Sequence, residues 1–186
     1  MSLQEQQNFL AKLYTDAELR RAFLSAPEKI GAENDLNERE IAEIAEIMPE
    51  ELNFFADSLF WKRLREAEKF LPVTRKILGE EFSGKFREFS QTFNPRTVKK
   101  HFEDALEFCR FLRHRNISEL VGNAAKFEQT KLEFFGLEKR IAVCRLNFDF
   151  RNLSDSGSDK PFELPEKKQI FVVWLRLGKS FRQFYF

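Results

Sequence analysis

Residues 168–186 read Lys168-Gln-Ile-Phe-Val-Val-Trp-Leu-Arg-Leu-Gly-Lys-Ser-Phe-Arg-Gln-Phe-Tyr-Phe186. Two runs rich in β-branched and aromatic residues flank Gly178-Lys179, a dipeptide that favours a tight turn. The pattern predicts two antiparallel strands, residues 168–177 and 180–186. These strands decide the fold class, because the sequence that precedes them is mostly helical in its periodicity.

A third strand is predicted over residues 139–151, which alternate between apolar and polar side chains. One face of this strand would carry Ala142, Cys144, Leu146, Phe148 and Phe150. Residues 152–165 have the composition of a loop. The three strands together predict a small antiparallel meander over residues 137–186.

Helices are predicted before residue 137, and capping signals mark their ends. Thr15-Asp-Ala-Glu18 and Asn37-Glu-Arg-Glu40 both fit a capping box, in which two side chains satisfy backbone N–H groups at a helix start. Proline suits the first turn of a helix, serine suits an N-cap and glycine suits a C-cap. These further signals are Pro49, Pro72, Ser118 and Gly136.

Apolar residues at helical spacing place the expected helices between these signals. The helices cover residues 15–26, 37–47, 49–71, 72–89 with a break at Gly79 or Gly84, 97–114 and 118–135. In the long helix that begins at Pro49, the expected inward side chains are Leu52, Phe55, Leu59 and Phe60. We therefore expect an α+β fold with a helical domain, residues 1–136, and a C-terminal appendage of antiparallel strands, residues 137–186.

Composition limits the class of protein. Apolar residues make up 42% of the chain and charged residues 33%, and no apolar run approaches the roughly 20 residues of a membrane span. The first residues lack the pattern of a signal peptide, so we expect a cytoplasmic location. The formal net charge is +1, which provides no general attraction for nucleic acid. Local charge is uneven: residues 28–51 carry nine acidic and two basic side chains, and residues 61–76 carry six basic and two acidic ones.

Catalytic and metal-binding motifs are not found in the sequence. There is no GxGxxG, GxxxxGK[ST] or GxSxG segment, and the two histidines lack the partners of a zinc site. Cys109 and Cys144 lie on apolar faces, where cysteine behaves as a small hydrophobic residue. Glu40, Glu43 and Glu46 lie at helical spacing and are interpreted as a solvated face. We expect no cofactor in this chain and no catalysis by it.

One candidate binding segment is basic. Trp61, Lys62, Arg65 and Lys69 lie within the long helix expected after Pro49, and Lys62, Arg65 and Lys69 fall on one side of it. Such a side could contact phosphate or an acidic partner. The alternative is an ordinary solvated helix face. Nucleic acid is the less favoured partner because of the low net charge.

The other candidate segment is the meander. An edge strand offers unpaired backbone groups to a partner, and this one is apolar with little charge to protect it. The candidate partner-binding residues there are Trp174, Arg176, Phe181, Phe184, Tyr185 and Phe186. They could accept an added strand from a partner peptide. The alternative is that the strands pack on the helical body and merely leave a short edge.

Two longer segments carry a family resemblance over about residues 10–135. The first is Trp61-Lys-Arg-Leu-Arg-Glu-Ala-Glu-Lys-Phe-Leu-Pro-Val-Thr-Arg-Lys-Ile-Leu-Gly79, followed by Glu-Glu-Phe-Ser-Gly-Lys-Phe-Arg-Glu-Phe89. The second is Asp104-Ala-Leu-Glu-Phe-Cys-Arg-Phe-Leu112, followed by Ala125-Lys-Phe-Glu128 and Leu132. Their order resembles the helical partner proteins of multinuclear non-haem iron-dependent oxidative enzymes, as in methanobactin biosynthesis. Leu13-Tyr-Thr-Asp-Ala-Glu-Leu-Arg-Arg-Ala-Phe23 looks like the N-terminal helix of such partners.

The resemblance implies a division of labour between two proteins. The enzymes of that family are TIM barrels that modify ribosomally made, cysteine-containing precursor peptides, and they hold the iron. This chain would dock such a barrel as a heterodimer and help to present the precursor peptide. No catalytic residue is carried over. The alternative function is a standalone interaction or regulatory protein, which could be a homodimer joined through its C-terminal strands.

Overall fold

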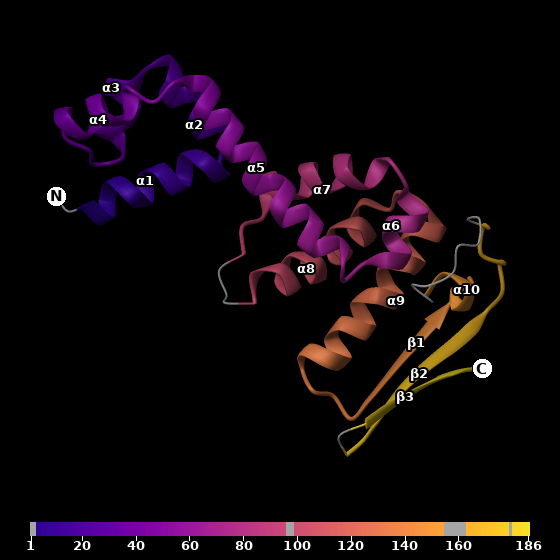
Figure 1. Cartoon of the computed structure of the whole chain (residues 1–186). Coiled ribbons are helices and arrows are strands. Elements are labelled where there is room, and N and C mark those ends of the chain that lie inside the picture. The colour runs from indigo at the N-terminus through magenta and orange to yellow at the C-terminus, as the bar shows by residue number, and fades with distance from the viewer. Residues whose placement is uncertain (1–2, 96–98, 155–162, 179) are drawn as a thin grey trace. The chain divides into compact units, whose positions relative to one another are not determined.

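The computed structural model describes residues 3–95, 99–154, 163–178 and 180–186. These residues form mainly helices, with one three-stranded antiparallel sheet near the C-terminus (Figure 1). The expected α+β fold is thereby confirmed. Residues 97 and 98 of the helix expected from residue 97, and residues 155–162 of the expected loop, lie outside the described residues.

The chain divides into two compact units, which are Met1–Lys62 with Ser90–Asn94, and Arg63–Phe89 with Pro95–Phe186. This division differs from the expected boundary at residue 136. That boundary falls inside the second unit because the helix before it and the strands after it share one core.

The two units also differ in charge. By sequence the first carries thirteen acidic and six basic residues, and the second carries seventeen acidic and 25 basic ones.

The first unit contains α1 (Leu3–Thr15), α2 (Ala17–Ser25), α3 (Pro27–Glu33), α4 (Glu38–Ala45) and most of α5 (Pro49–Glu68). The start of α2 corrects one prediction. Asp16, not Thr15, is its N-cap, because one Asp16 carboxylate oxygen accepts the N–H groups of Glu18 and Leu19, both at 2.9 Å. Thr15 instead ends α1, where its hydroxyl donates to the carbonyl of Ala11.

The start of α4 confirms the second capping box. The Asn37 side chain accepts the N–H of Glu40 at 3.0 Å, and the Glu40 carboxylate accepts the N–H of Asn37 at 3.0 Å. This role buries Glu40. The expectation of a solvated face is therefore wrong for Glu40, whereas Glu43 and Glu46 are exposed.

Side chains from α1, α2, α4 and the α3–α4 connection build the core of the first unit: Phe9, Leu13, Phe23, Leu36, Ile41 and Ile44. The rings of Phe9 and Phe23 meet edge to face, with centroids 5.3 Å apart. Gly31 allows the backbone of α3 to approach α4. A β-carbon at position 31 would lie 2.4 Å from Cγ1 of Ile41.

We predict that Gly31→Ala destabilises the protein by about 1–3 kcal/mol, because the added methyl group displaces the buried Ile41 side chain. Urea unfolding followed by circular dichroism measures the change. Gly122→Ala in α9 is the matched control, since a β-carbon there has nothing within 4 Å. The control should gain up to about 1 kcal/mol from helix propensity. Equal losses in both variants would contradict the steric explanation.

The second unit contains the end of α5, α6 (Pro72–Leu78), α7 (Glu81–Thr92) as far as Phe89, α8 (Lys100–Arg115), α9 (Glu119–Gly136), α10 (Arg151–Ser154) and the sheet. Phenylalanines join α7 to α8. The ring of Phe108 contacts those of Phe82, Phe86 and Phe89, with centroids 5.1 to 5.4 Å apart. The three α7 residues lie at i, i+4 and i+7 and therefore share one side of the helix.

Buried carboxylates connect distant helices of this unit. Glu128 of α9 accepts the N–H of Val73 at 2.7 Å and of Thr74 at 3.0 Å, so it caps the start of α6 from 55 residues away. Burial raises the pKa of Glu128 to about 7 although both N–H donors favour the carboxylate form. Asp104 of α8 is held by two hydrogen bonds from Arg63, at 2.6 and 2.8 Å.

The sheet consists of β1 (Ile141–Leu146), β2 (Ile170–Leu177) and β3 (Ser180–Tyr185) in the order β1-β2-β3, with antiparallel pairing throughout. The three predicted strands are therefore confirmed, although β1 is shorter than expected. It ends because Asn147 leaves the ladder and donates its N–H to the side chain of Asn123 on α9 at 2.8 Å. Gly178 has a φ of 64° in the turn between β2 and β3, which suits glycine.

One face of the sheet packs on α9 and α6. The buried side chains of this core are Val73, Ala124, Phe127, Phe134, Cys144, Leu146, Phe150, Leu153, Ile170, Val172 and Trp174. The predicted inner face of the first strand is thus confirmed. Gly136 is not the C-cap of α9: that position is Leu137. Gly136 is needed for packing, because a β-carbon there would lie 2.2 Å from the ring of Phe102.

Candidate binding surface

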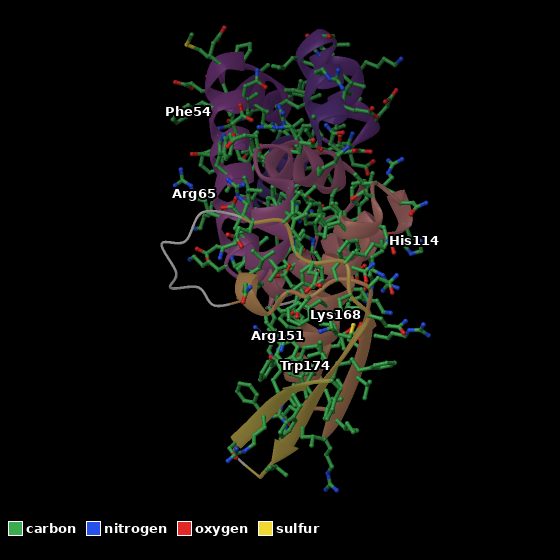
Figure 2. All side chains as sticks on the ribbon, turned by 90° about the vertical axis from the view of Figure 1, so that its right-hand side faces the viewer. Phe54, Arg65, His114, Arg151, Lys168 and Trp174 are labelled. Carbon is green, nitrogen blue, oxygen red and sulfur yellow. The ribbon has the colours of Figure 1, made fainter. Side chains whose placement is uncertain are left out.

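Trp174 and Arg176 of β2, two of the expected partner-binding residues, lie on the inner face of the sheet and are engaged within the unit. Trp174, labelled in Figure 2, is 0% exposed and packs on Phe127 with ring centroids 5.5 Å apart. Its indole N–H donates to the side chain of Gln183 on β3 at 2.9 Å. A residue enclosed on all sides cannot contact a partner. Even-numbered β2 residues point inward, and the sequence pattern did not distinguish the two faces of this strand.

Arg176 is also occupied within the unit. Its guanidinium donates to the carbonyls of Lys139 and Phe134 at 3.3 and 3.4 Å and lies 5.2 Å from the ring centroid of Phe134. These contacts of Arg176 hold the end of β2 against the end of α9. We interpret Arg176 as a structural residue and no longer as a partner-binding one.

Phe181 and Tyr185 lie on the inner side of β3, where the core is incomplete. Phe181 is 51% exposed, and its ring meets Phe135 of α9 edge to face at 4.7 Å. Tyr185 is half-buried; the side-chain amide of Gln183 donates to its hydroxyl, and Arg151 lies 5.8 Å from its ring centroid. These two residues keep part of their surface available at the edge of the sheet.

The outer face of the sheet is apolar and exposed. Phe184 and Phe186, both expected binding residues, lie on it with exposed fractions of 39% and 74%. The other apolar members are Ile141, Val143, Phe171, Val173, Leu175 and Leu177. None of these six was among the expected binding residues, although the alternation along the strands contained the signal. Large apolar patches on a folded surface mark sites of interaction.

The two edge strands of the sheet, β1 and β3, differ in whether other parts of the chain contact them. At the β1 edge, the Lys126 ammonium donates to the carbonyl of Arg145 at 2.8 Å, and α9 lies alongside. At the β3 edge, Phe171 and Phe186 exchange both backbone hydrogen bonds. Because such pairs alternate in antiparallel sheets, the backbone groups of Phe181 and Gln183 point away from β2. Within the described residues, no further strand pairs with β3.

The basic segment does not form one site in a single unit. Trp61 and Lys62 belong to the first unit, whereas Arg65 and Lys69 belong to the second. Trp61 is 43% exposed, and Lys62 and Arg65 are exposed as well. Lys69 lies just beyond the end of α5 and forms an ion pair with Glu66 at 2.6 Å.

The N-terminal half of α5 corrects another expectation. Leu52 is buried as predicted, but Phe55 and Leu59 are 47% and 37% exposed. Phe54 is more exposed still and points away from the helix at the margin of the view in Figure 2. The helix has more apolar residues than its core-facing side can accommodate, so apolar periodicity misassigned Phe55 and Leu59.

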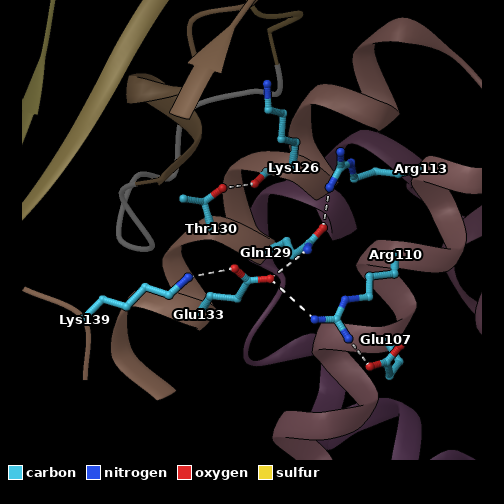
Figure 3. A network of polar contacts seen from close by, with 8 residues as sticks. All are labelled: Glu107, Arg110, Arg113, Lys126, Gln129, Thr130, Glu133 and Lys139. Carbon is cyan, nitrogen blue, oxygen red and sulfur yellow. Dashed lines mark hydrogen bonds and ion pairs between the residues drawn. The ribbon is translucent and has the colours of Figure 1, made fainter. Parts of the chain in front are cut away.

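A network of polar contacts joins α8 to α9 (Figure 3). Glu133 is its centre, since it accepts from Gln129 at 2.9 Å and pairs with Lys139 at 3.1 Å and Arg110 at 3.5 Å. Arg113 donates to Gln129 at 2.7 Å. The charges satisfy one another, so we interpret the network as a helix–helix contact.

Other kinds of site receive no support from the described residues. No group of three or more histidine, cysteine, aspartate or glutamate side chains there is placed to hold a metal ion. Cys109 and Cys144 are buried and unpaired, as expected, and burial raises the pKa of both thiols. None of the described helices has the length and apolar composition that crossing a membrane requires.

A comparison with family models, curated proteins and solved structures finds no match to this chain. The resemblance to partner proteins of iron-dependent enzymes therefore stays a prediction from the sequence. The candidate binding surface is therefore defined by its geometry alone. It consists of an apolar face of the sheet beside the open edge of β3.

Proposed function

We propose that this protein is a non-catalytic accessory subunit whose C-terminal sheet binds another polypeptide. The observation that carries the proposal is the open β3 edge, which combines outward-pointing backbone groups with exposed phenylalanines. Edges of this kind are normally shortened, charged or covered. Here three of the last six residues are phenylalanines that are 39% to 74% exposed.

An extended peptide fits the β3 edge by strand addition. The N–H and C=O groups of Phe181 and Gln183 would pair with the peptide backbone, and successive peptide side chains would fall on alternate faces of the sheet. Those on the inner side would meet Phe181 and Tyr185. Those on the outer side would meet Phe184 and Phe186, so apolar residues at alternate positions would favour binding.

The resemblance over residues 10–135 suggests which proteins take part. The peptide would be a ribosomally made precursor peptide, and the enzyme would be an iron-dependent TIM barrel that holds the metal and performs the modification. The proposal includes a cytoplasmic location, in line with the two unpaired cysteines among the described residues. Coexpression with a TIM-barrel protein encoded beside this chain, followed by size-exclusion chromatography at micromolar concentration, tests the pairing. Separate elution, or the lack of such a barrel protein, would refute the iron-enzyme part.

Phe181→Pro tests strand addition. Proline removes the outward N–H at position 181 and keeps the bonds from β3 to β2, so we expect precursor-peptide affinity to fall by about tenfold or more in fluorescence anisotropy. Phe181→Ala is the matched control, because it loses the same ring but keeps the N–H. Equal affinities of the two variants, with unchanged thermal melting, would show that the backbone edge is not used.

The same edge supports a second candidate function, a homodimer paired β3 to β3. Two copies of an edge strand can pair about a two-fold axis and satisfy both sets of outward groups. Light scattering of the isolated protein distinguishes the candidates. A dimer that Phe181→Pro converts to a monomer would favour self-association, whereas a wild-type monomer would favour the accessory subunit.

A further inference from the structure

The outer face of the sheet has an ordered arrangement of side chains. The register places its residues in three rows across the strands. The rows are Ile141–Leu175–Arg182, Val143–Val173–Phe184 and Arg145–Phe171–Phe186. Seven of these nine side chains are apolar. The face lies on the side of the sheet away from α9, which covers the inner face (Figure 1).

Charge on this face has one sign. Arg145 and Arg182 occupy opposite corners of the three rows, and both are exposed. No aspartate or glutamate lies at an outward position of the three strands, and no ion pair involves either arginine among the described residues. The side-chain amide of Gln169 faces the guanidinium of Arg145. Because the amide is neutral, this contact positions the Arg145 side chain but does not compensate its positive charge.

The distance between the two corners limits what can cover the face. With strands about 4.8 Å apart and a rise of about 3.4 Å per residue, the α-carbons of Arg145 and Arg182 are separated by about 17 Å along the diagonal. On an α-helix this distance corresponds to about eleven residues, which is three turns and returns to the same side of the helix. Sheet faces in layered folds are commonly covered by helices, as α9 covers the inner face here.

We infer that the outer face binds an amphipathic helix of a partner protein, with an apolar stripe and two carboxylates about eleven residues apart. This inference rests on the proposed accessory function and names the chemistry of its partner. The carboxylates pair with Arg145 and Arg182, and the stripe covers the central row. A second copy of the same face is a poorer occupant, because it would bury four arginines without a carboxylate between them.

Synthetic helical peptides test the inference on the intact protein. One peptide carries an apolar stripe with two glutamates eleven residues apart, and its matched control has lysine at both positions. We expect the glutamate peptide to bind about tenfold more tightly in fluorescence anisotropy at low salt. The difference should shrink at high salt, because exposed charges are screened. Equal affinities, or no binding of either peptide at millimolar concentration, would overturn the inference.

Substitutions in the protein complete the test. Arg145→Glu with Arg182→Glu should reverse the preference between the two peptides, and Arg145→Gln with Arg182→Gln should abolish it. Val143→Glu should weaken both peptides. If the wild-type protein forms a concentration-dependent dimer and Val143→Glu is monomeric, a second copy covers the face instead. A barrel complex that forms normally with Val143→Glu would overturn this inference and leave the accessory function standing.

Discussion

Replacing Trp174 with alanine should destabilise the protein by about 3–5 kcal/mol, the range for truncating a large buried aromatic residue. The side chain is 0% exposed, and it fills the centre of the core between α9 and the sheet. The substitution also leaves the Gln183 side chain without the indole donor. Because small domains are stable by only about 5–15 kcal/mol, the variant should be partly unfolded at moderate temperature. Thermal and urea unfolding followed by circular dichroism measure the loss.

Trp61→Ala is the matched control, since Trp61 is 43% exposed. We expect it to cost less than about 1 kcal/mol. Trp61→Phe leaves Trp174 as the only tryptophan, and its fluorescence emission should then be that of a buried indole until the second unit unfolds. If Trp174→Ala keeps wild-type stability and loses only peptide binding, Trp174 is a surface residue after all.

Wild-type stability should fall as pH rises from about 4.5 to about 7, relative to the stability of Glu128→Gln. Burial raises the pKa of Glu128 from an ordinary 4.5 to about 7 in the folded protein. Between these values the folded state binds more protons than the unfolded chain, so raising the pH favours unfolding. The full linkage amounts to about 3 kcal/mol, because one pKa unit corresponds to about 1.4 kcal/mol.

Urea unfolding of both proteins between pH 4.5 and 8 measures this linkage. Glutamine cannot titrate, so other ionisable groups contribute equally to both proteins and cancel in the difference. Glu128→Gln loses one of the two acceptors for the N–H groups of Val73 and Thr74, which adds an offset that does not vary with pH. A difference that is constant over the whole range would mean that the two N–H donors keep Glu128 ionised despite its burial.

Local sequence signals predicted the elements whose causes are themselves local. Asn37 and Glu40 form the capping box that their spacing indicated, and Ser118 begins α9 by accepting the N–H of Val121. Pro72 begins α6, and the alternation after residue 139 gives a strand with Cys144 and Leu146 inward. In each case a pattern of side chains within a few residues identified the element, although Glu128 of α9 also caps the start of α6 from a distance.

Local signals failed where a neighbouring residue competed for the same role or where the deciding contact is distant. Thr15 matched a capping pattern, but α1 continued through it and Asp16 became the cap. Gly136 matched a C-cap, but its lack of a side chain accommodates the ring of Phe102. Trp174 and Phe184 belong to the same apolar segment, yet Trp174 is buried and Phe184 is exposed. This difference follows from the register of strand pairing and from the packing of a helix on one face of the sheet.

The sequence by itself determined that this chain has helices followed by three antiparallel strands, and that phenylalanine supplies much of its apolar surface. The number of apolar residues in the C-terminal strands already exceeded what one face of a small sheet can bury. Only the tertiary structure decided which face α9 covers, that side chains of α9 contact the β1 edge, and that Arg145 and Arg182 stand at opposite corners of the uncovered face. The physical reason is that periodicity fixes which residues share a face, whereas packing against a distant helix selects the face that is buried.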